Sequence, residues 1–346
     1  MAHKRIGILT GGGDCPGLNA AIRGVARRVL PEGYTVVGLM GGWEGLLQMQ
    51  TRELDYASIS GILHVGGTIL RTSRTNVLKD EATIQKAFEN FKKLELDGIV
   101  AIGGEGTLTV SAKLFEMGMP LVGVPKTIDN DIDQTDFTFG FATAVEIATE
   151  AIDRLHTTAE SHNRVMVIEV MGRHAGWIAT YSGIAGGADV CLIPEKARDI
   201  KEVCAIVEAR KKRGKSFSIV VVAEGAKVLI DGQEMGVSKA RKDPFGRPLL
   251  GGIGQFLADE IEKSTGIEAR VTVLGHVQRG GTPTASDRVL ATTYGIFAGE
   301  LVLAGKWGTM PSLQGGVMNP VTLAKATERL KTVPQRYIDI LESLEG

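Results

Sequence analysis

Cysteines are few in this sequence, and their arrangement excludes a disulfide framework. Three of the 346 residues are cysteines, Cys15, Cys191 and Cys204, and they form neither a CxxC pair nor an even-numbered set. Secreted proteins that depend on disulfides carry even numbers of cysteines at regular spacings. The cysteine content therefore favours a reducing compartment, and we expect a cytoplasmic protein.

An excess of charge of one sign is also absent. The 39 lysines and arginines nearly balance the 40 aspartates and glutamates, so the chain has no overall attraction for nucleic acid or an anionic membrane. No apolar run has membrane-spanning length, and the first eight residues lack the long apolar core of an export signal. We expect no nucleic-acid partner, no membrane and no export, so a phosphate ligand must be bound by local groups.

Short β-branched runs alternate with helical patterns along the chain. At this length and with 43% hydrophobic residues, two domains are expected. Apolar residues at helical spacing, for example at 84, 87, 88 and 91, separate the predicted strands 5–9, 34–39, 98–102, 120–124, 165–170, 218–223 and 270–274. This order predicts an α/β fold of two three-layer domains with mainly parallel sheets, in which ligands bind at the carboxyl ends of the strands. Residues 226–250 break the alternation with turn residues and are predicted to be an irregular insertion.

Two glycine-rich segments follow predicted strands and have the composition of phosphate-binding loops. Residues 9–19 (LTGGGDCPGLN) precede a predicted helix at Ala20, and residues 102–108 (IGGEGTL) repeat the arrangement with an added carboxylate. Backbone amides of such loops bind phosphate, and Glu105 stands where a phosphate-bound Mg²⁺ needs a ligand. Neither segment completes a dinucleotide fingerprint or a P-loop. A tight turn before a helix is the alternative interpretation of each segment taken alone.

An acidic segment comes just after the predicted strand at 120–124. On an extended chain its two-residue spacing places Asp129 and Asp131 side by side. One carboxylate can then remove a proton from a hydroxyl while the other helps to hold a metal or tunes the affinity for that proton. This geometry suits phosphoryl transfer, and a solvated acidic turn is the alternative if the segment is taken alone.

Basic residues close to glycines give the complementary signal for phosphate. They are Arg71, Arg74, Arg173, His276 and Arg279. Guanidinium groups match the geometry of phosphate oxygens. Each of these residues alone is more often a surface cation or a structural histidine.

Five motifs taken together resemble the 6-phosphofructokinase family in order and spacing, over about residues 5–298. They are the segments 11–19, 103–107, 125–131 (PKTIDND), 171–173 (MGR) and 275–281 (GHVQRGG). Five motifs in the family's order outweigh the separate alternatives for each segment. The resemblance implies a phosphofructokinase-like fold and a glycolytic kinase that transfers a phosphoryl group to fructose 6-phosphate with the help of Mg²⁺.

The resemblance also implies roles for the matching residues. It makes Asp129 the general base for the sugar's 1-hydroxyl, with Thr127, Arg74 and Arg173 as the other catalytic residues. It implies a phosphoryl-donor site at Gly12, Arg74, Gly104, Glu105, Gly106, Thr107 and Lys126, with Glu105 at the Mg²⁺ position. It implies a sugar-phosphate site at Thr127, Asp129, Asp131, Arg164, Met171, Gly172, Arg173, Glu224, Arg270, His276 and Arg279.

The family further implies how the chain is divided and assembled. Residues 1–140 with 277–326 are expected to bind the phosphoryl donor, and residues 141–276 with 327–346 the sugar phosphate. In the family, Arg164 and Arg270 correspond to arginines that come from a neighbouring subunit. We therefore expect a homotetramer whose active sites are shared between subunits.

Two positions separate ATP-dependent from pyrophosphate-dependent members of the family, and here they are mixed. Gly106 leaves room for a nucleotide where an Asp would crowd its α-phosphate, whereas Lys126 is typical of pyrophosphate users and of one ATP-dependent branch. Steric exclusion is the stronger constraint, so ATP is expected and pyrophosphate is the alternative. A silent nucleotide-binding subunit and a nicotinamide-dependent dehydrogenase are disfavoured, because both aspartates are present and no dinucleotide fingerprint is complete.

Overall fold

Each run predicted as a strand is a strand in the computed structural model, which describes residues 4–234 and 251–346. These strands are β1 (Arg5–Gly11), β2 (Thr35–Leu39), β4 (Gly98–Gly103), β5 (Leu121–Thr127), β7 (Val165–Val170), β10 (Ser218–Ala223) and β13 (Ala269–Val273). The predicted end of β5 was wrong, because the strand continues through Pro125 and Lys126 to Thr127. The first residues of the acidic motif are therefore held by the sheet.

The chain divides into two units, each built from two separate stretches of sequence. Unit 1 comprises Met1–Thr143 and Arg279–Lys331, and unit 2 comprises Ala144–Gln278 and Thr332–Gly346. The chain passes between the units after residues 143, 278 and 331, compared with the expected 140, 276 and 326. Among the residues described, no helix combines the length and the apolar character needed to cross a membrane.

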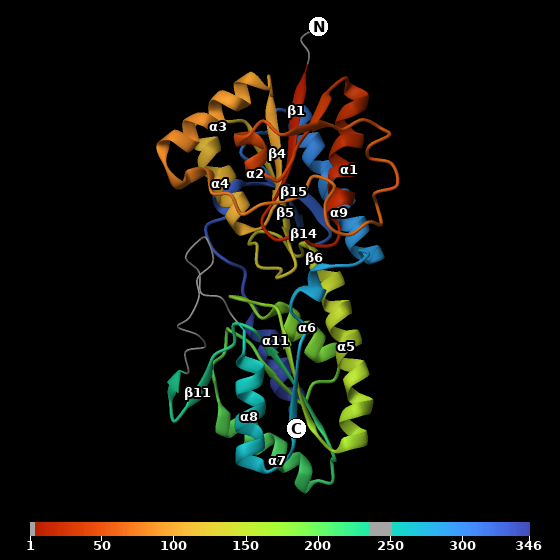
Figure 1. Ribbon diagram of the computed structural model, residues 1–346, viewed down its shortest axis with the longest axis vertical. Helices are drawn as coiled ribbons and strands as arrows, with labels where there is room; N and C mark the ends of the chain where they lie inside the picture. Colours follow the sequence, from red (N-terminus) through yellow and green to blue (C-terminus); the bar gives the residue numbers. More distant parts are fainter. Residues whose placement is uncertain (1–3, 235–250) are drawn as a thin grey trace. The chain divides into compact units, whose positions relative to one another are not determined.

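Unit 1 is built on a sheet in the order β15-β14-β5-β4-β1-β2-β3, with β6 paired to β5. The additional strands are β3 (Thr51–Glu53), β6 (Phe139–Gly140), β14 (Thr309–Gln314) and β15 (Val317–Thr322). Neighbours run parallel except β2 with β3 and β14 with β15. Figure 1 shows α1 (Leu18–Val29) and α9 (Ala285–Leu303) on one side of this sheet, and α2 (Trp43–Leu47), α3 (Glu81–Lys93) and α4 (Glu105–Glu116) on the other.

The core of unit 1 follows from the two-residue period of its strands. Leu9, Leu39 and Ala101 pack in one cluster with buried residues of α2, α3 and α4. The intervening residues, such as Ile8 and Ile102, are buried as well. Strands buried on both faces are typical of parallel sheets that are covered by helices on each side. The predicted α/β class with mainly parallel sheets is confirmed.

Unit 2 contains a smaller sheet of parallel strands in the order β13-β7-β10-β8, where β8 is Val190–Leu192. One face packs against α7 (Ile200–Lys212) and α8 (Ile253–Thr265). The helix α6 (Trp177–Ala185) lies against β8 and β10, and α11 (Gln335–Leu344) packs on α6. The long helix α5 (Phe141–His162) carries the chain into this unit.

Part of the predicted irregular insertion has regular structure. β11 (Val228–Ile230) pairs with β12 (Gln233–Glu234) and with β9 (Arg198–Asp199) in a small third sheet. The prediction was therefore wrong for these strands, because Asp231 and Gly232 form a tight hairpin turn with positive φ angles rather than an open loop. Residues 235–250 of the insertion lie outside the described residues.

Candidate active site

The carboxyl ends of β1, β4 and β5 meet at one edge of the unit 1 sheet. The register places Gly11 opposite Gly103, and Gly103 opposite Pro125. The two glycine-rich segments and the acidic segment all leave the sheet from these three strands. Parallel strands that end together bring the loops after them together, so residues far apart in sequence form one site.

The first glycine loop, residues 11–17, is closely packed by its neighbours. Gly12 has a φ of 76°, its backbone N–H donates to the carbonyl of Ser73 at 3.3 Å, and its carbonyl accepts from Thr72 Oγ1 at 2.6 Å. A Cβ on Gly13 would lie 2.4 Å from an Arg279 nitrogen. Glycine suits both positions, because Gly12 has a positive φ and a side chain on Gly13 would displace Arg279. The exposed Arg74 directly follows Thr72 and Ser73, the two residues that bond Gly12.

The second glycine loop, residues 103–107, begins α4. Gly104 is the residue before the helix, and Glu105 is its first residue, where the helix dipole favours negative charge. The side chain of Thr107 fills the space between the two loops, because a Cβ on Gly11 or Gly103 would lie within 2.5 Å of it. A Cβ on Gly106, in contrast, would meet no heavy atom of the described residues within 4 Å. Of these predicted donor residues, Gly106 thus borders open space and Thr107 is buried.

Two cations hold the first glycine loop from within the unit. Lys126 Nζ donates to the carbonyl of Gly13, and Arg279 Nη1 donates to the carbonyl of Asp14 at 3.2 Å. The Lys126 side chain is buried, and this burial lowers its pKa. A buried ammonium group is stabilised by an anion nearby, so the site suits a phosphate. Arg279, expected among the sugar-binding residues, contacts the donor loop in the described structure.

The acidic segment turns sharply instead of running extended, so that prediction was wrong. Asn130 is buried with a φ of 50°, in the left-handed region, and its Oδ1 accepts from the backbone N–H of Thr138 at 3.0 Å. Asp129 N–H donates to Thr127 Oγ1 at 3.0 Å. Asparagine tolerates the left-handed conformation better than most residues. The turn is therefore fixed by hydrogen bonds to the side chains of Thr127 and Asn130. The two-residue spacing of the aspartates in the sequence gives no sign of these bonds.

The turn nevertheless places the carboxylates close enough to interact. Burial, together with the negative charges of Asp129 and Glu105, raises the pKa of Asp131 to about 7. Like charges in a buried site oppose full ionisation. The three carboxylates thus form one electrostatic group at the ends of β4 and β5.

The three carboxylates are suited to the way in which proteins bind Mg²⁺. Within the described ranges 4–234 and 251–346, no set of three or more His, Cys, Asp or Glu side chains is arranged as a complete metal cage. Mg²⁺ is usually held by one or two carboxylates, with phosphate oxygens and water as its other ligands. The negative charge that Glu105 shares with Asp129 and Asp131 matches that mode of binding.

A second cluster of predicted residues lies at the carboxyl ends of β7 and β10 in unit 2. Met171, Gly172 and Arg173 follow β7, and Glu224 follows β10 and donates its N–H to Val170 at 2.8 Å. Gly225 N–H donates to Gly172 at 3.0 Å. Arg173 Nη1 is buried and has no hydrogen-bond partner within the part of the chain that the structure describes. This donor is suited to an anionic ligand.

Gln278 belongs to this cluster but was missed by the sequence analysis. It is fully buried, its Oε1 accepts from Met171 N–H at 3.3 Å, and its Nε2 donates to Gly275 at 3.1 Å. Gln278 lies inside the motif 275–281, and its place in this motif was the sequence signal that could have identified it. The neighbouring His276 is exposed.

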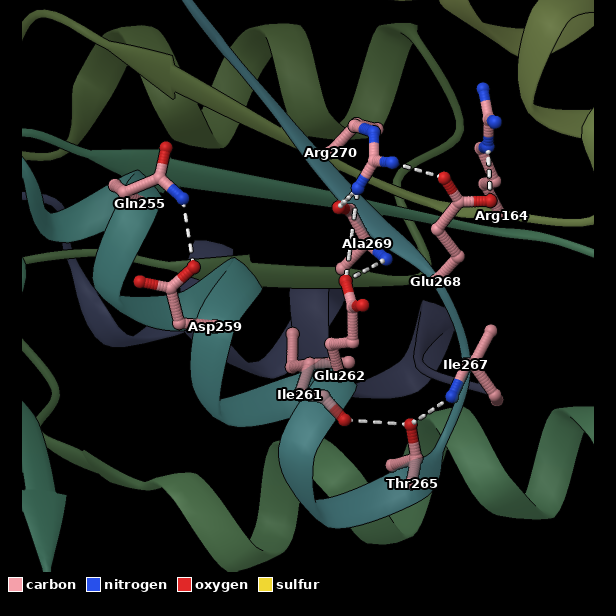
Figure 2. Close-up of polar contacts among 10 residues, drawn as sticks. All are labelled: Arg164, Gln255, Asp259, Ile261, Glu262, Thr265, Ile267, Glu268, Ala269 and Arg270. Atoms are coloured by element: carbon pink, nitrogen blue, oxygen red, sulfur yellow. Dashed lines mark hydrogen bonds and ion pairs between the residues drawn. The ribbon is translucent and has the colours of Figure 1, made fainter.

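Arg164 and Arg270 lie side by side at the edge of the unit 2 sheet. Arg270 is on the edge strand β13, and Arg164 directly precedes the neighbouring strand β7. Figure 2 shows Glu268 between the two guanidinium groups. Arg164 Nε is 2.7 Å from Glu268 Oε2, Arg270 Nη2 bonds the other oxygen, and Arg270 Nη1 is 3.8 Å from Glu262. Hydrogen bonding from Arg164 lowers the pKa of Glu268. The shared carboxylate keeps two cations together on an exposed edge.

Comparison with known proteins identifies the family. A family model described as Phosphofructokinase matches residues 5–302. A pyrophosphate–fructose 6-phosphate 1-phosphotransferase of Streptomyces coelicolor is 54% identical, over 97% of this chain and 98% of its own. ATP-dependent 6-phosphofructokinase 3 of the same organism is 52% identical, over 97% of this chain and 98% of its own.

Solved structures agree with these relatives. The T-state phosphofructokinase of Pichia pastoris has a TM-score of 0.83 at 30% identity, covering 99% of this chain and 36% of that chain. A pyrophosphate-dependent phosphofructokinase from Marinobacter aquaeolei has a TM-score of 0.82 at 23% identity, covering 99% of this chain and 92% of that chain, and shares the fold. The resemblance seen in the five motifs is confirmed: the chain belongs to the phosphofructokinase family, whose members are phosphotransferases.

Proposed function

We propose that the protein transfers the γ-phosphoryl group of ATP to the 1-hydroxyl of fructose 6-phosphate, giving fructose 1,6-bisphosphate and ADP. The observation that carries the choice of donor is the open space at Gly106. Glycine brings neither a side chain nor a charge to this position on the first turn of α4, so an α-phosphate and nucleoside can extend past it.

Asp129 accepts the proton of the attacking hydroxyl in this proposal. The Asp129 and Asp131 pair resists a double negative charge, as the raised pKa of Asp131 indicates. A carboxylate pair that binds a proton near neutral pH is matched to general-base catalysis. The Thr127 hydroxyl, which accepts from Asp129 N–H, keeps the base at the end of β5.

Cations and backbone donors stabilise the charge that develops on the transferred group. Lys126 and Arg279 lie at the first glycine loop, Arg74 adjoins it, and Arg173 supplies a buried donor. Gly12, Gly104 and Thr107 shape the donor site around them. Glu105 would hold Mg²⁺, which neutralises phosphate charge and aligns the phosphate oxygens when bound.

The sugar phosphate is assigned to the second cluster and to the paired arginines. Met171, Gly172, Arg173, Glu224 and His276 form the sugar site of unit 2, in which Glu224 accepts hydrogen bonds from sugar hydroxyls. Arg164 and Arg270 bind the 6-phosphate of a substrate in a neighbouring subunit, so the active sites are shared within an oligomer, and we propose a homotetramer. Unit 1 is then the donor domain and unit 2 the sugar-phosphate domain.

Pyrophosphate is the second candidate donor, and a specific observation favours it. Lys126 is a buried cation at the first glycine loop, where it can attract a compact polyanion. Relatives of 54% identity carry the name of the pyrophosphate-dependent enzyme, and relatives of 52% identity that of the ATP-dependent enzyme. The two names therefore do not discriminate between the donors.

Steady-state kinetics with each donor tests the proposal. The purified protein is assayed with Mg²⁺ and fructose 6-phosphate, and fructose 1,6-bisphosphate is measured through aldolase coupling. We expect kcat/KM to be higher with ATP than with pyrophosphate. Formation of the bisphosphate from pyrophosphate but not from ATP would show that the donor assignment is wrong.

A further inference from the structure

Lys331, the last residue of unit 1, contacts the turn that carries Asp129 and Asp131, although it lies 200 residues further along the chain. Its backbone N–H donates to the carbonyl of Asp131 at 2.9 Å. Its Nζ donates to Asn130 Oδ1 at 2.9 Å and to the carbonyls of Thr135 and Asp136 at 2.8 and 2.9 Å. The backbone and the ammonium group of one residue thus bind both sides of the same turn.

The turn depends on bonds of this kind because its backbone is not in a regular element. Asn130 is fully buried and left-handed, and such a conformation of a residue other than glycine persists only where the surroundings fix it. Asn130 Oδ1 accepts from Thr138 N–H as well as from Lys331. The carbonyls of Thr135 and Asp136, a few residues further along, accept from the same ammonium group. Lys331 provides three donors from one group.

The charged groups around Lys331 affect the protonation that its three hydrogen bonds require. Burial lowers the pKa of Lys331 to about 8, against the opposing effect of the carboxylates of Asp136, Asp131 and Asp133. The ammonium group therefore remains protonated at neutral pH and retains all three donors. Arg329, on the same stretch of chain, is an informative contrast: its side chain is 74% exposed and pairs with Asp133 on the outside of the turn.

We propose that Lys331 is a positioning residue for the reaction, which holds the turn at residues 129–131 so that Asp129 points at the substrate hydroxyl. It acts through Asn130, the residue between the two aspartates, and through the carbonyl of Asp131. The catalytic part of this inference rests on the proposed function. A displacement of about 1 Å at a reacting group lowers turnover by up to about 100-fold, which sets the size of the expected effect.

The test compares Lys331→Met and Lys331→Arg with the matched control Arg329→Met in the full-length protein. Methionine keeps the length of the side chain and removes the charge and all three donors. Arginine keeps the charge but cannot place three donors on the same oxygens, so an intermediate effect is expected. Removing the exposed cation of Arg329 should have little effect, because exposed ion pairs stabilise weakly.

Hydrogen exchange gives a readout that does not depend on activity. In Lys331→Met the backbone amides of residues 128–138 should exchange at least about tenfold faster than in the wild type, with β1 and β4 unchanged. The Arg329→Met protein should match the wild type. Unchanged exchange in Lys331→Met would overturn the proposal, whatever the wild-type activity. Loss of folding in both Lys331 variants would also overturn it, because Lys331 would then serve the fold alone.

Steady-state kinetics then tests whether the turn geometry that Lys331 holds is needed for catalysis. We expect kcat of Lys331→Met to fall by about 10- to 100-fold, with KM for both substrates within about threefold of the wild type and Lys331→Arg between the two. Wild-type kcat in Lys331→Met, or an equal loss in Arg329→Met, would contradict the positioning role. A wild-type protein that is inactive with both ATP and pyrophosphate would refute the proposed function instead, and the exchange result would stand by itself.

Discussion

Replacing Asp131 with asparagine is expected to make the protein more stable at alkaline pH while lowering its turnover. The substitution keeps the shape of the side chain and removes its charge. In the wild type, Asp131 is charged above neutral pH in a buried site that also contains Asp129 and Glu105, which is why burial and these two charges raise its pKa to about 7. The variant has no such charge to bury.

The size of the effect follows from the difference between the folded and unfolded states. The pKa of Asp131 is about 7 in the fold, against an ordinary value of 3.8. A carboxyl with a raised pKa stabilises the fold at low pH, and this contribution is lost as the pH rises toward 7. A difference of about 3 corresponds to about 4 kcal/mol above pH 7. The gain in the free energy of unfolding of the variant over the wild type should be about 2–3 kcal/mol smaller at pH 5 than at pH 8.

Urea unfolding at pH 5 and pH 8 measures this difference, with EDTA present so that no divalent cation neutralises the site. Asp133→Asn is the matched control. Partial burial raises the pKa of Asp133, but hydrogen bonds from Arg329 and Gln134 outweigh it and lower the pKa overall. That variant should gain no stability at pH 8. An Asp131→Asn protein no more stable than the wild type at pH 8, or an equal gain in Asp133→Asn, would refute the electrostatic reasoning.

Three further substitutions test individual parts of the site. Asp129→Asn should lower kcat by at least about 100-fold with nearly unchanged KM, because it removes a positioned base, and near-normal kcat would exclude Asp129 as the base. Gly106→Asp should raise KM for ATP far more than KM for pyrophosphate, and an unchanged KM for ATP would show that this position does not select the donor. Gly225→Ala should raise KM for fructose 6-phosphate by at least about tenfold, since its Cβ would lie 2.0 Å from the carbonyl oxygen of Arg173. An unchanged KM for the sugar phosphate would separate Gly225 from the sugar site.

The strands that carry the site were predictable from the sequence, because strands buried on both faces consist of short runs of apolar, β-branched residues. β1, β4 and β5 are short β-branched runs that end at glycine or at the acidic motif. The rule that ligands bind at the carboxyl ends of parallel strands then predicted a site at the ends of these strands. The register that sets Gly11 opposite Gly103 was not predictable, because strand order is a property of tertiary packing.

Other features have no signal in the local sequence. β14 and β15 contain Pro311 and Pro320, which argue against a strand, yet they pair with each other next to β5 in the sheet. The turn at Asn130 is fixed by Thr138 and by Lys331, which is distant in sequence. Spacing alone therefore indicated an extended acidic segment, and only the tertiary contacts account for its turn.

The choice of ATP as the phosphoryl donor, at the site formed by the two glycine loops and Asp129, can be tested with both donors present. A competition experiment tests it most directly: the protein is incubated with Mg²⁺, fructose 6-phosphate and equal concentrations of ATP and pyrophosphate, and phosphorus NMR follows both donors. We expect ADP and fructose 1,6-bisphosphate to appear together while pyrophosphate persists. Consumption of pyrophosphate with ATP left intact would contradict it.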